Sequence, residues 1–387
     1  MRRFLLLGVL ALASLCLVRP AESAPVPAVA KKPKVEVVFC LDTTGSMGGL
    51  IDGAKAKIWA ICNQIAGGKP TPDLKVGLVA YRDKGDDYIT KVVDLTDDLD
   101  KIHGQLKTFQ ATGGGDTPEH VNKALYDAVH GIKWSDDKKT LKIIFLVGDA
   151  PPHMDYTDDV KYPITCKKAV EKNIINNTIQ CGSDADCTKA WKDIALKSEG
   201  SFAAIPQDGG VVAIATPFDA RLAKINSELA DTTLAYGSAR VRQSAAMSKD
   251  AAKRLDPAAA ADRAGFAGKT GGGSAAPKAA APGGPASARG GDLVEAFRDK
   301  KVDLATVKEE DLPDEVRKLK TPKERKEYLE KVETNRVKLQ KEALDLDKKR
   351  GTHIAEEMKK KGKGKDSFDS SVLEMLRKQA KKYDIKY

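Results

Sequence analysis

Two predominantly apolar runs limit the folds open to this chain more than any other feature. Val35–Leu41 and Leu141–Val147 are dominated by aliphatic and β-branched residues, and each is far shorter than a membrane span. Such runs are typical of strands that are buried on both faces of a parallel sheet. Apolar residues at helical spacing follow the first run, from Ile51 to Ile65. The sequence therefore predicts a Rossmann-like, doubly wound α/β fold with a mostly parallel sheet.

Further elements continue this alternation up to about residue 240. Strands are expected at Leu74–Tyr81, Ile89–Val93, Ile174–Cys181 and Ser201–Ile205, and helices at Leu99–Phe109, Thr117–Val129, around Trp191–Ala195, and from Thr216-Pro217 to Leu229 as the closing helix. The predicted domain spans residues 34–240. Sheets of this class bind their ligands at the carboxyl ends of the strands.

Hydroxyl and carboxylate side chains follow the first strand directly. Asp42, Thr44 and Ser46 alternate along a turn in which Gly45 permits tight folding. The second apolar strand ends at Asp149, and a glycine-rich stretch leads to Thr117. Three loops thus bring only oxygen donors to one edge of the sheet. This donor set suits a hard cation such as Mg²⁺ or Mn²⁺.

These motifs resemble the metal-ion-dependent adhesion site of von Willebrand factor type A domains. The resemblance covers about residues 34–237 and includes the order of strands and helices. The DTTGSM and GDTPE motifs, at residues 42–47 and 115–119, resemble a bacterial subgroup in which some members are fused to alpha-type kinases. No kinase-like segment is visible in this sequence.

The resemblance implies a role for each site residue. Ser46, Thr44 and Thr117 would contact the cation directly, whereas Asp42 and Asp149 would act largely through water. Thr44 stands where serine is more usual, and the hydroxyl group is kept.

Each of these residues also has a purely structural interpretation. Thr117 precedes Pro118 and could cap a helix, Asp42 could cap its own turn, and Asp149 could accept hydrogen bonds from the turn that follows it. The occurrence of all five positions at strand ends favours the metal site. Asp116, Glu119 and His153 should lie near the same edge, either as surface residues or as determinants of partner preference.

The N-terminus predicts export. Arg2 and Arg3 precede an apolar stretch, and small residues end at Ser23, so residues 1–23 are expected to be a secretory signal peptide. The mature protein would then work outside the cytoplasm, in the periplasm, in the cell envelope or in the medium. Two of Cys166, Cys181 and Cys187 could pair in such a compartment, and their spacing does not say which.

Positive charge is concentrated in the last part of the chain. The formal net charge is +10, yet residues 31–240 carry 27 Lys and Arg against 29 Asp and Glu. The predicted domain is therefore no polyanion binder, and no nucleic-acid partner is expected. The basic tail could serve an anionic envelope surface or only solubility.

The tail is expected to comprise a linker and a helical region. Residues 241–291, rich in Ala, Gly and Pro, read as a disordered linker, and residues 292–387 as a charged helical region. Thr321 and Glu324 form a capping box for a long helix, and Ser371 and Glu374 form a second box. The apolar stripe of the long helix is thin, which does not favour a stable coiled coil.

Together these features predict an exported, non-enzymatic protein that binds an acidic side chain of a partner protein through its cation. Two alternatives stay open. A metal-dependent hydrolase or phosphotransferase would need a general base, for which Glu119 and His153 are weak candidates. A passive structural protein would bind the envelope through its basic tail.

Overall fold

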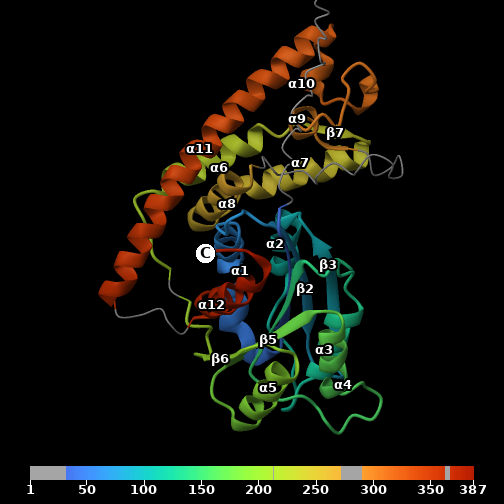
Figure 1. The fold of residues 1–387 in the computed structure, drawn as a ribbon, viewed down its shortest axis with the longest axis vertical. Coiled ribbons are helices and arrows are strands. Elements are labelled where there is room, and N and C mark those ends of the chain that lie inside the picture. Colours follow the sequence, from blue (N-terminus) through green and yellow to red (C-terminus); the bar gives the residue numbers. More distant parts are fainter. Residues whose placement is uncertain (1–31, 212, 272–289, 362–366) are drawn as a thin grey trace, which may run out of the picture. The chain divides into compact units, whose positions relative to one another are not determined.

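A six-stranded, mostly parallel sheet lies among helices in the lower half of the view in Figure 1. The computed structural model describes residues 32–211, 213–271, 290–361 and 367–387. The strand order is β3-β2-β1-β4-β5-β6, and the pairing of β2 with β3 is antiparallel while the others are parallel. The strands are β1 (Lys34–Asp42), β2 (Asp73–Tyr81), β3 (Thr90–Thr96), β4 (Thr140–Gly148), β5 (Ile174–Cys181) and β6 (Phe202–Ile205). The predicted fold class is confirmed.

Helices cover both faces of this sheet. One face packs against α1 (Gly48–Ile65), α2 (Leu99–Thr108) and α12 (Phe368–Ala380), and the other against α3 (Val121–His130), α4 (Tyr162–Glu171) and α5 (Ala185–Lys197). Alternate residues of β1 supply the two cores, since Val37 and Phe39 belong to the first and Val38 and Cys40 to the second. This alternation explains why every residue from Val37 to Leu41 is apolar.

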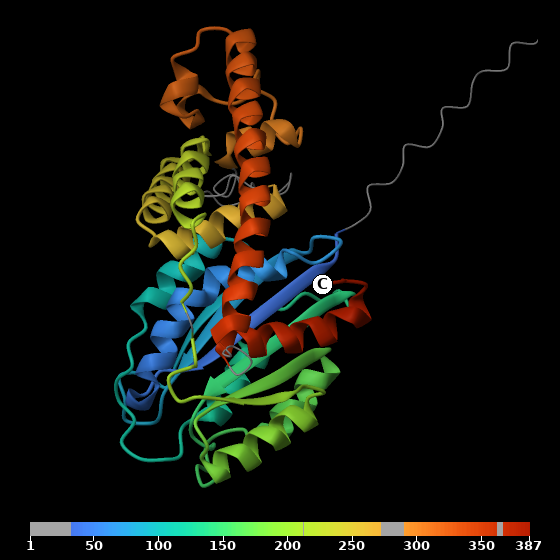
Figure 2. The ribbon, with the colours of Figure 1, turned by 90° about the vertical axis from the view of Figure 1, so that its left-hand side faces the viewer.

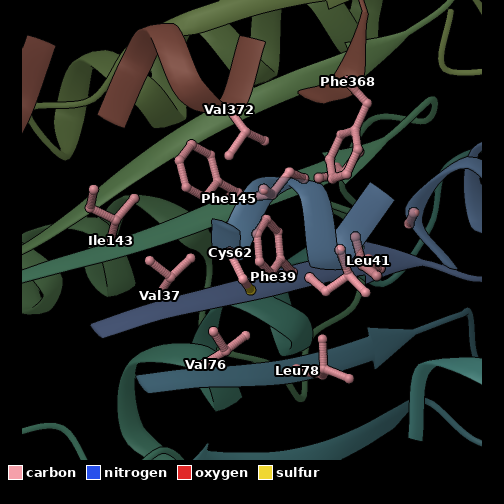
Figure 3. Close-up of a cluster of buried hydrophobic side chains, with 14 of the residues drawn as sticks. Val37, Phe39, Leu41, Cys62, Val76, Leu78, Ile143, Phe145, Phe368 and Val372 are labelled. Carbon is pink, nitrogen blue, oxygen red and sulfur yellow. The ribbon is translucent and has the colours of Figure 1, made fainter. Parts of the chain in front are cut away.

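The C-terminal helix α12 completes the first of these faces. Phe368 and Val372 point from α12 toward Phe39 and Phe145 of the central strands (Figure 3). The ring centroids of Phe39 and Phe368 are 6.1 Å apart. Residues from the two ends of the described chain therefore share one core.

A helical segment lies between β6 and α12 in the sequence (Figure 2). Its longer elements are α6 (Asp219–Asp231), α7 (Ala239–Lys253), α8 (Pro257–Thr270) and α11 (Pro322–Lys361), and its shorter ones are β7 (Ala235–Gly237), β8 (Gly290–Asp292), α9 (Leu293–Arg298), η3 (Glu309–Asp311) and α10 (Asp314–Arg317). The strands β7 and β8 pair antiparallel. The described residues of this segment form two apolar clusters of their own.

The helix predicted to close the sheet domain exists, but it does not pack on the sheet. This helix is α6, and its Leu222, Ile225 and Leu229 pack against alanines of α8 and against α11. The position on the sheet is taken by α12 instead. An apolar stripe shows that a helix face is buried, but it does not identify the surface that buries it.

The predicted disordered linker at 241–291 is also corrected. Helix α7 and helix α8 together occupy most of residues 241–270, while residues 272–289 lie outside the described part. Ala261 and Ala264 are fully buried, and a Cβ atom added to Gly268 would come within 2.9 Å of the backbone oxygen of Gln340. The small residues thus allow close contact between helices, and alanine is the strongest helix former.

Buried ion pairs fasten the helical segment to the sheet domain and stabilise it internally. Arg263 of α8 donates two hydrogen bonds to the carboxylate of Asp100 in α2, at 2.7 and 2.8 Å. Within the segment, Arg336 pairs with Asp292 and Arg350 pairs with Asp262, each at 2.7 Å. Part of the basic charge of the tail is therefore structural.

The first predicted capping box is confirmed and the second is wrong. The backbone N–H of Thr321 donates to Glu324 Oε2 at 2.9 Å, and the backbone N–H of Glu324 donates to Thr321 Oγ1 at 3.2 Å. Helix α12 begins at Phe368 with Ser367 as its N-cap, one turn before the predicted Ser371.

The five cysteines of the described residues are buried free thiols: Cys40, Cys62, Cys166, Cys181 and Cys187. Two of Cys166, Cys181 and Cys187 could have paired, but the structure shows all three as free thiols. The predicted signal peptide, residues 1–23, lies outside the described part. Among the described residues, no helix is both long and apolar enough to cross a bilayer.

Candidate functional site: a cavity at the carboxyl end of the sheet

The first loop of the candidate site is held by Asp42. Asp42 ends β1 and is fully buried, and its Oδ1 accepts hydrogen bonds from the backbone N–H of Thr44 at 2.9 Å and from Thr44 Oγ1 at 2.6 Å. Thr44 Oγ1 lies 3.4 Å from Ser46 Oγ, at the start of the short helix η1 (Gly45–Met47). Asp42 Oδ2 is buried without a hydrogen-bond partner among the described residues.

The hydroxyl of the neighbouring Thr43 bonds to β2 and to Tyr88 instead of facing the site. Its Oγ1 donates to the backbone oxygen of Tyr81 at 2.9 Å and lies 2.7 Å from the Tyr88 hydroxyl. Thr43 therefore anchors the loop to β2. The hydroxyl of Thr44, with Ser46 beside it, is the one that faces the candidate site.

The second loop interlocks with the first. The backbone N–H of Gly45 donates to Gly113 O at 3.0 Å, and that of Thr112 donates to Thr43 O at 3.1 Å. Gly114 has a φ of 74°, and an added Cβ would lie 3.0 Å from Thr44 Cβ. Glycine is therefore required at this close contact.

The second loop is not the start of a helix. Thr117 is exposed, and α3 begins four residues later, at Val121. The prediction that Thr117 caps this helix is therefore wrong. The loop makes no use of the Thr117 hydroxyl as an N-cap, which leaves that hydroxyl free to serve the site.

The third loop follows β4 and carries Asp149. Gln207 Nε2 donates to Asp149 Oδ2 at 2.6 Å and to the backbone oxygen of Ser46 at 3.4 Å. The Gln207 amide thus bridges the first and third loops, a role that its sequence context does not indicate. Gly148 is needed here because an added Cβ would lie 3.0 Å from Asp42 Oδ2.

The three loops, together with residues that follow β5 and β6, line one cavity of about 470 Å³. Its lining includes four of the five predicted site residues, Thr44, Ser46, Thr117 and Asp149, together with Asp116, Glu119, Ser183 and Gln207. The fifth, Asp42, is buried and bonded to Thr44. The structure therefore brings all five together, and Glu119 and Gln207 join them.

Negative charge accumulates around this cavity. Burial raises the pKa of Asp42 to about 7, against hydrogen bonds from Thr44 that lower it, and Asp149 and Asp86 raise it further. Burial likewise raises the pKa of Glu119 to about 9, with contributions from Asp42 and Asp83. Several carboxyl groups thus disfavour one another's charged forms in a small volume, a situation that a bound cation relieves.

The chain matches known proteins over the sheet domain. Residues 36–210 match the family model described as von Willebrand factor A domain. The human von Willebrand factor A domain-containing protein 7 is 36% identical over 121 residues, which are 31% of this chain and 12% of that protein. The mouse protein of the same name matches to the same extent. This chain therefore spans only a small part of the length of these curated relatives.

Two solved structures match part of this chain at low sequence identity. The SpRpn10 VWA domain is 16% identical, with a TM-score of 0.35, and the match covers 45% of this chain and 88% of that chain. Proximal thread matrix protein 1 from the mussel byssus, with a zinc-occupied MIDAS motif, is 14% identical with a TM-score of 0.37, over 46% of this chain and 43% of that chain.

The sheet order, the helices on both faces and the family match over residues 36–210 together support a von Willebrand factor A domain in this part of the chain.

Proposed function

We propose that this protein is exported and binds a partner protein through a divalent cation, Mg²⁺ or Mn²⁺, held at the cavity described above. Thr44, Ser46 and Thr117 would be its direct ligands. Asp42 and Asp149 would support it, largely through water. An acidic side chain of the partner would complete the coordination shell.

The observation that carries this proposal is the convergence of the three loops. Thr44, Ser46, Thr117 and Asp149 come from distant parts of the sequence, yet they line one cavity. These side chains offer only oxygen donors, which suits Mg²⁺ and Mn²⁺. The buried Asp42 Oδ2, without a partner among the described residues, also fits a cation nearby.

The surface next to the cavity supports a protein partner. The loop after Asp149 continues into a second, larger hollow of about 680 Å³, lined in part by Pro151, Met154 and Leu196. Met154 is 49% exposed and Leu196 is 80% exposed. Exposed apolar side chains beside a charged site are typical of surfaces that bind other proteins.

Affinity capture tests the proposal directly. The mature protein is immobilised and offered material from its own source, in parallel with Mg²⁺ and with EDTA. We expect a partner that is retained with Mg²⁺ and lost with EDTA or in a Ser46→Ala variant. Ser183→Ala is the matched control, because Ser183 lines the same cavity without belonging to the proposed ligand set. Equal capture by wild type and Ser46→Ala would contradict the proposal.

A second candidate, a metal-dependent hydrolase or phosphotransferase, gains support from one observation. The Glu119 carboxyl lines the same cavity as the proposed ligands and could hold a proton for transfer. Turnover of a phosphoester panel that EDTA abolishes, and that Glu119→Gln abolishes as well, would favour this candidate over adhesion.

Export is the part of the proposal that rests on sequence alone. The order of charged, apolar and small residues before Ala24 supports cleavage after Ser23. N-terminal sequencing of the protein isolated from its source tests this, with Ala24 expected as the first residue. The basic tail would bind an anionic envelope surface, and cosedimentation of the full chain with anionic vesicles measures this binding.

A further inference from the structure

Three side chains with metal-binding groups meet beside the cavity, outside the ligand set proposed above. Asp83 follows β2, Asp116 belongs to the loop before α3, and His153 belongs to the loop after β4. One donor atom of each lies within 4.8 Å of the other two. The three residues thus come from three separate loops at the same edge of the sheet.

The carboxylate of Asp155 holds the imidazole of His153 through its Nδ1 atom. Its Nδ1 lies 2.8 Å from Asp155 Oδ1, and its Nε2 lies 3.4 Å from Asp83 Oδ2. The ring stacks on Tyr156, with centroids 4.0 Å apart. A carboxylate on Nδ1 fixes the proton on that nitrogen and leaves the lone pair of Nε2 available. This is the arrangement found behind histidines that bind metals.

Asp83 presents an unused oxygen in the same place. The Tyr156 hydroxyl donates to Asp83 Oδ2 at 2.7 Å, and Asp83 Oδ1 is buried without a hydrogen-bond partner among the described residues. His153 Nε2 is likewise buried with no hydrogen-bond partner there. Both residues are at most 5% exposed. Two buried acceptor atoms without hydrogen-bond partners, on side chains in contact with each other, are costly unless a cation or proton lies nearby.

We propose that Asp83, Asp116 and His153 form a second divalent-metal site, distinct from the one at Thr44 and Ser46. The donor set of one imidazole and two carboxylates selects a transition metal such as Zn²⁺ over Mg²⁺, which prefers oxygen ligands alone. The chain would thus hold two cations of different chemistry side by side.

The geometry suits such an ion. Ligands bound at about 2.0–2.2 Å in tetrahedral geometry are about 3.3–3.6 Å apart, and the 3.4 Å between His153 Nε2 and Asp83 Oδ2 matches that edge. Asp116 is exposed, so its side chain can close the remaining distance. Asp116 is also next to Thr117 in sequence, so one loop would contribute to both sites.

Metal titration of the untagged full chain tests the proposal. The first site is blocked with excess Mg²⁺, and Co²⁺ is then added as a spectroscopic substitute for Zn²⁺. We expect a single equivalent of Co²⁺ to bind, with visible absorption bands, and Zn²⁺ to displace it. No Co²⁺ or Zn²⁺ binding in excess Mg²⁺ would overturn the proposal.

Four variants locate the ion. His153→Gln and Asp116→Asn should each lose this equivalent, and Asp116 is exposed, so its replacement leaves the fold intact. His130→Gln, which changes an exposed histidine elsewhere, should keep it. Ser46→Ala should also keep the bound equivalent of Co²⁺ but should lose Mg²⁺ binding at the first site. Loss of Co²⁺ binding in Ser46→Ala, or its retention in both His153→Gln and Asp116→Asn, would contradict a separate site. A thiolate absorption band would assign the ion to cysteine and overturn the proposal as well.

Discussion

Thr44 Oγ1 donates to Asp42 Oδ1 at 2.6 Å, while the other oxygen of the same carboxylate is buried without a hydrogen-bond partner among the described residues. Asp42 thus fixes the hydroxyl of Thr44 with one oxygen, and its second oxygen lies beside Gly148 at the end of β4. The loop is organised before any cation arrives. Asp42 is in this sense a positioning residue, and the hydroxyls of Thr44 and Ser46 are the groups offered to the ion.

The stability of the metal-free protein should fall as pH rises. The pKa of Asp42 is raised from 3.8 to about 7, so the folded state holds this proton more tightly than the unfolded state. This contribution is complete below pH 3.8 and is lost as pH rises through about 7. The pKa of Glu119 is raised from 4.5 to about 9, so this group lowers stability in the same direction over a higher pH range. Thermal unfolding in EDTA and in Mg²⁺ measures the effect.

Mg²⁺ should therefore raise the unfolding temperature more at about pH 8 than at about pH 5. Asp42→Asn cannot titrate and is the control, so its EDTA curve should depend less on pH than that of wild type. A benefit of Mg²⁺ that is equal at both pH values would contradict the account of these carboxyl groups.

Gln207 should matter for metal affinity although it is not a proposed ligand. It bridges Asp149 Oδ2 and the backbone oxygen of Ser46, at 2.6 and 3.4 Å. Removing an outer-shell partner weakens metal binding by about 10–100-fold, so Gln207→Ala should weaken Mn²⁺ binding in calorimetry by about tenfold. Gln105→Ala on the exposed side of α2 is the control. Identical affinities in the two variants would show that the Gln207 bridge has no role.

The ion pair between α8 and α2 should stabilise the chain. Arg263 and Asp100 have side chains only 3% and 8% exposed, and removal of one partner leaves the other charge buried. Arg263→Ala should lower the free energy of unfolding by about 3–5 kcal/mol in urea. Arg221→Ala breaks a pair with Glu342 that is 38% and 37% exposed and should cost less than about 1 kcal/mol. Equal losses would mean that α8 is not fastened through Arg263.

The packing of helix α12 on the sheet should contribute to the free energy of unfolding of the sheet domain. Phe368 is 1% exposed and packs on Phe39. Phe368→Ala should cost about 3–5 kcal/mol of unfolding free energy, as for other large buried aromatics. Leu196→Ala, at a side chain 80% exposed, should change it by no more than about 0.5 kcal/mol. A small effect of Phe368→Ala would indicate that α12 is dispensable for the core.

The sheet and the candidate site were predictable because their signals are local. A predominantly apolar run such as Val35–Leu41 has few structural solutions, and Asp42, Thr44 and Ser46 follow it within a few residues. Gln207, Asp83 and the orientation of His153 carry no comparable signal. Their roles depend on loops that meet only when the sheet is complete.

The helices α7 and α8, which lie in the predicted linker, were missed for a different physical reason. Alanine and glycine in α8 suggested a flexible chain, yet Ala261 and Ala264 are buried and Gly268 allows close approach of α11. Small residues without apolar periodicity can either remain solvated or form tight helix contacts. The sequence alone does not decide between these outcomes, because the deciding partner, α11, lies far along the chain.

Isothermal titration of Mn²⁺ into the mature protein tests the central claim most directly, with Ser46→Ala and Ser183→Ala compared in the same buffer. The account predicts that Ser46→Ala loses at least about tenfold in affinity, while Ser183→Ala, altered in the same cavity, binds like wild type. Wild-type affinity in Ser46→Ala, or no Mn²⁺ binding by the unaltered protein, would contradict it.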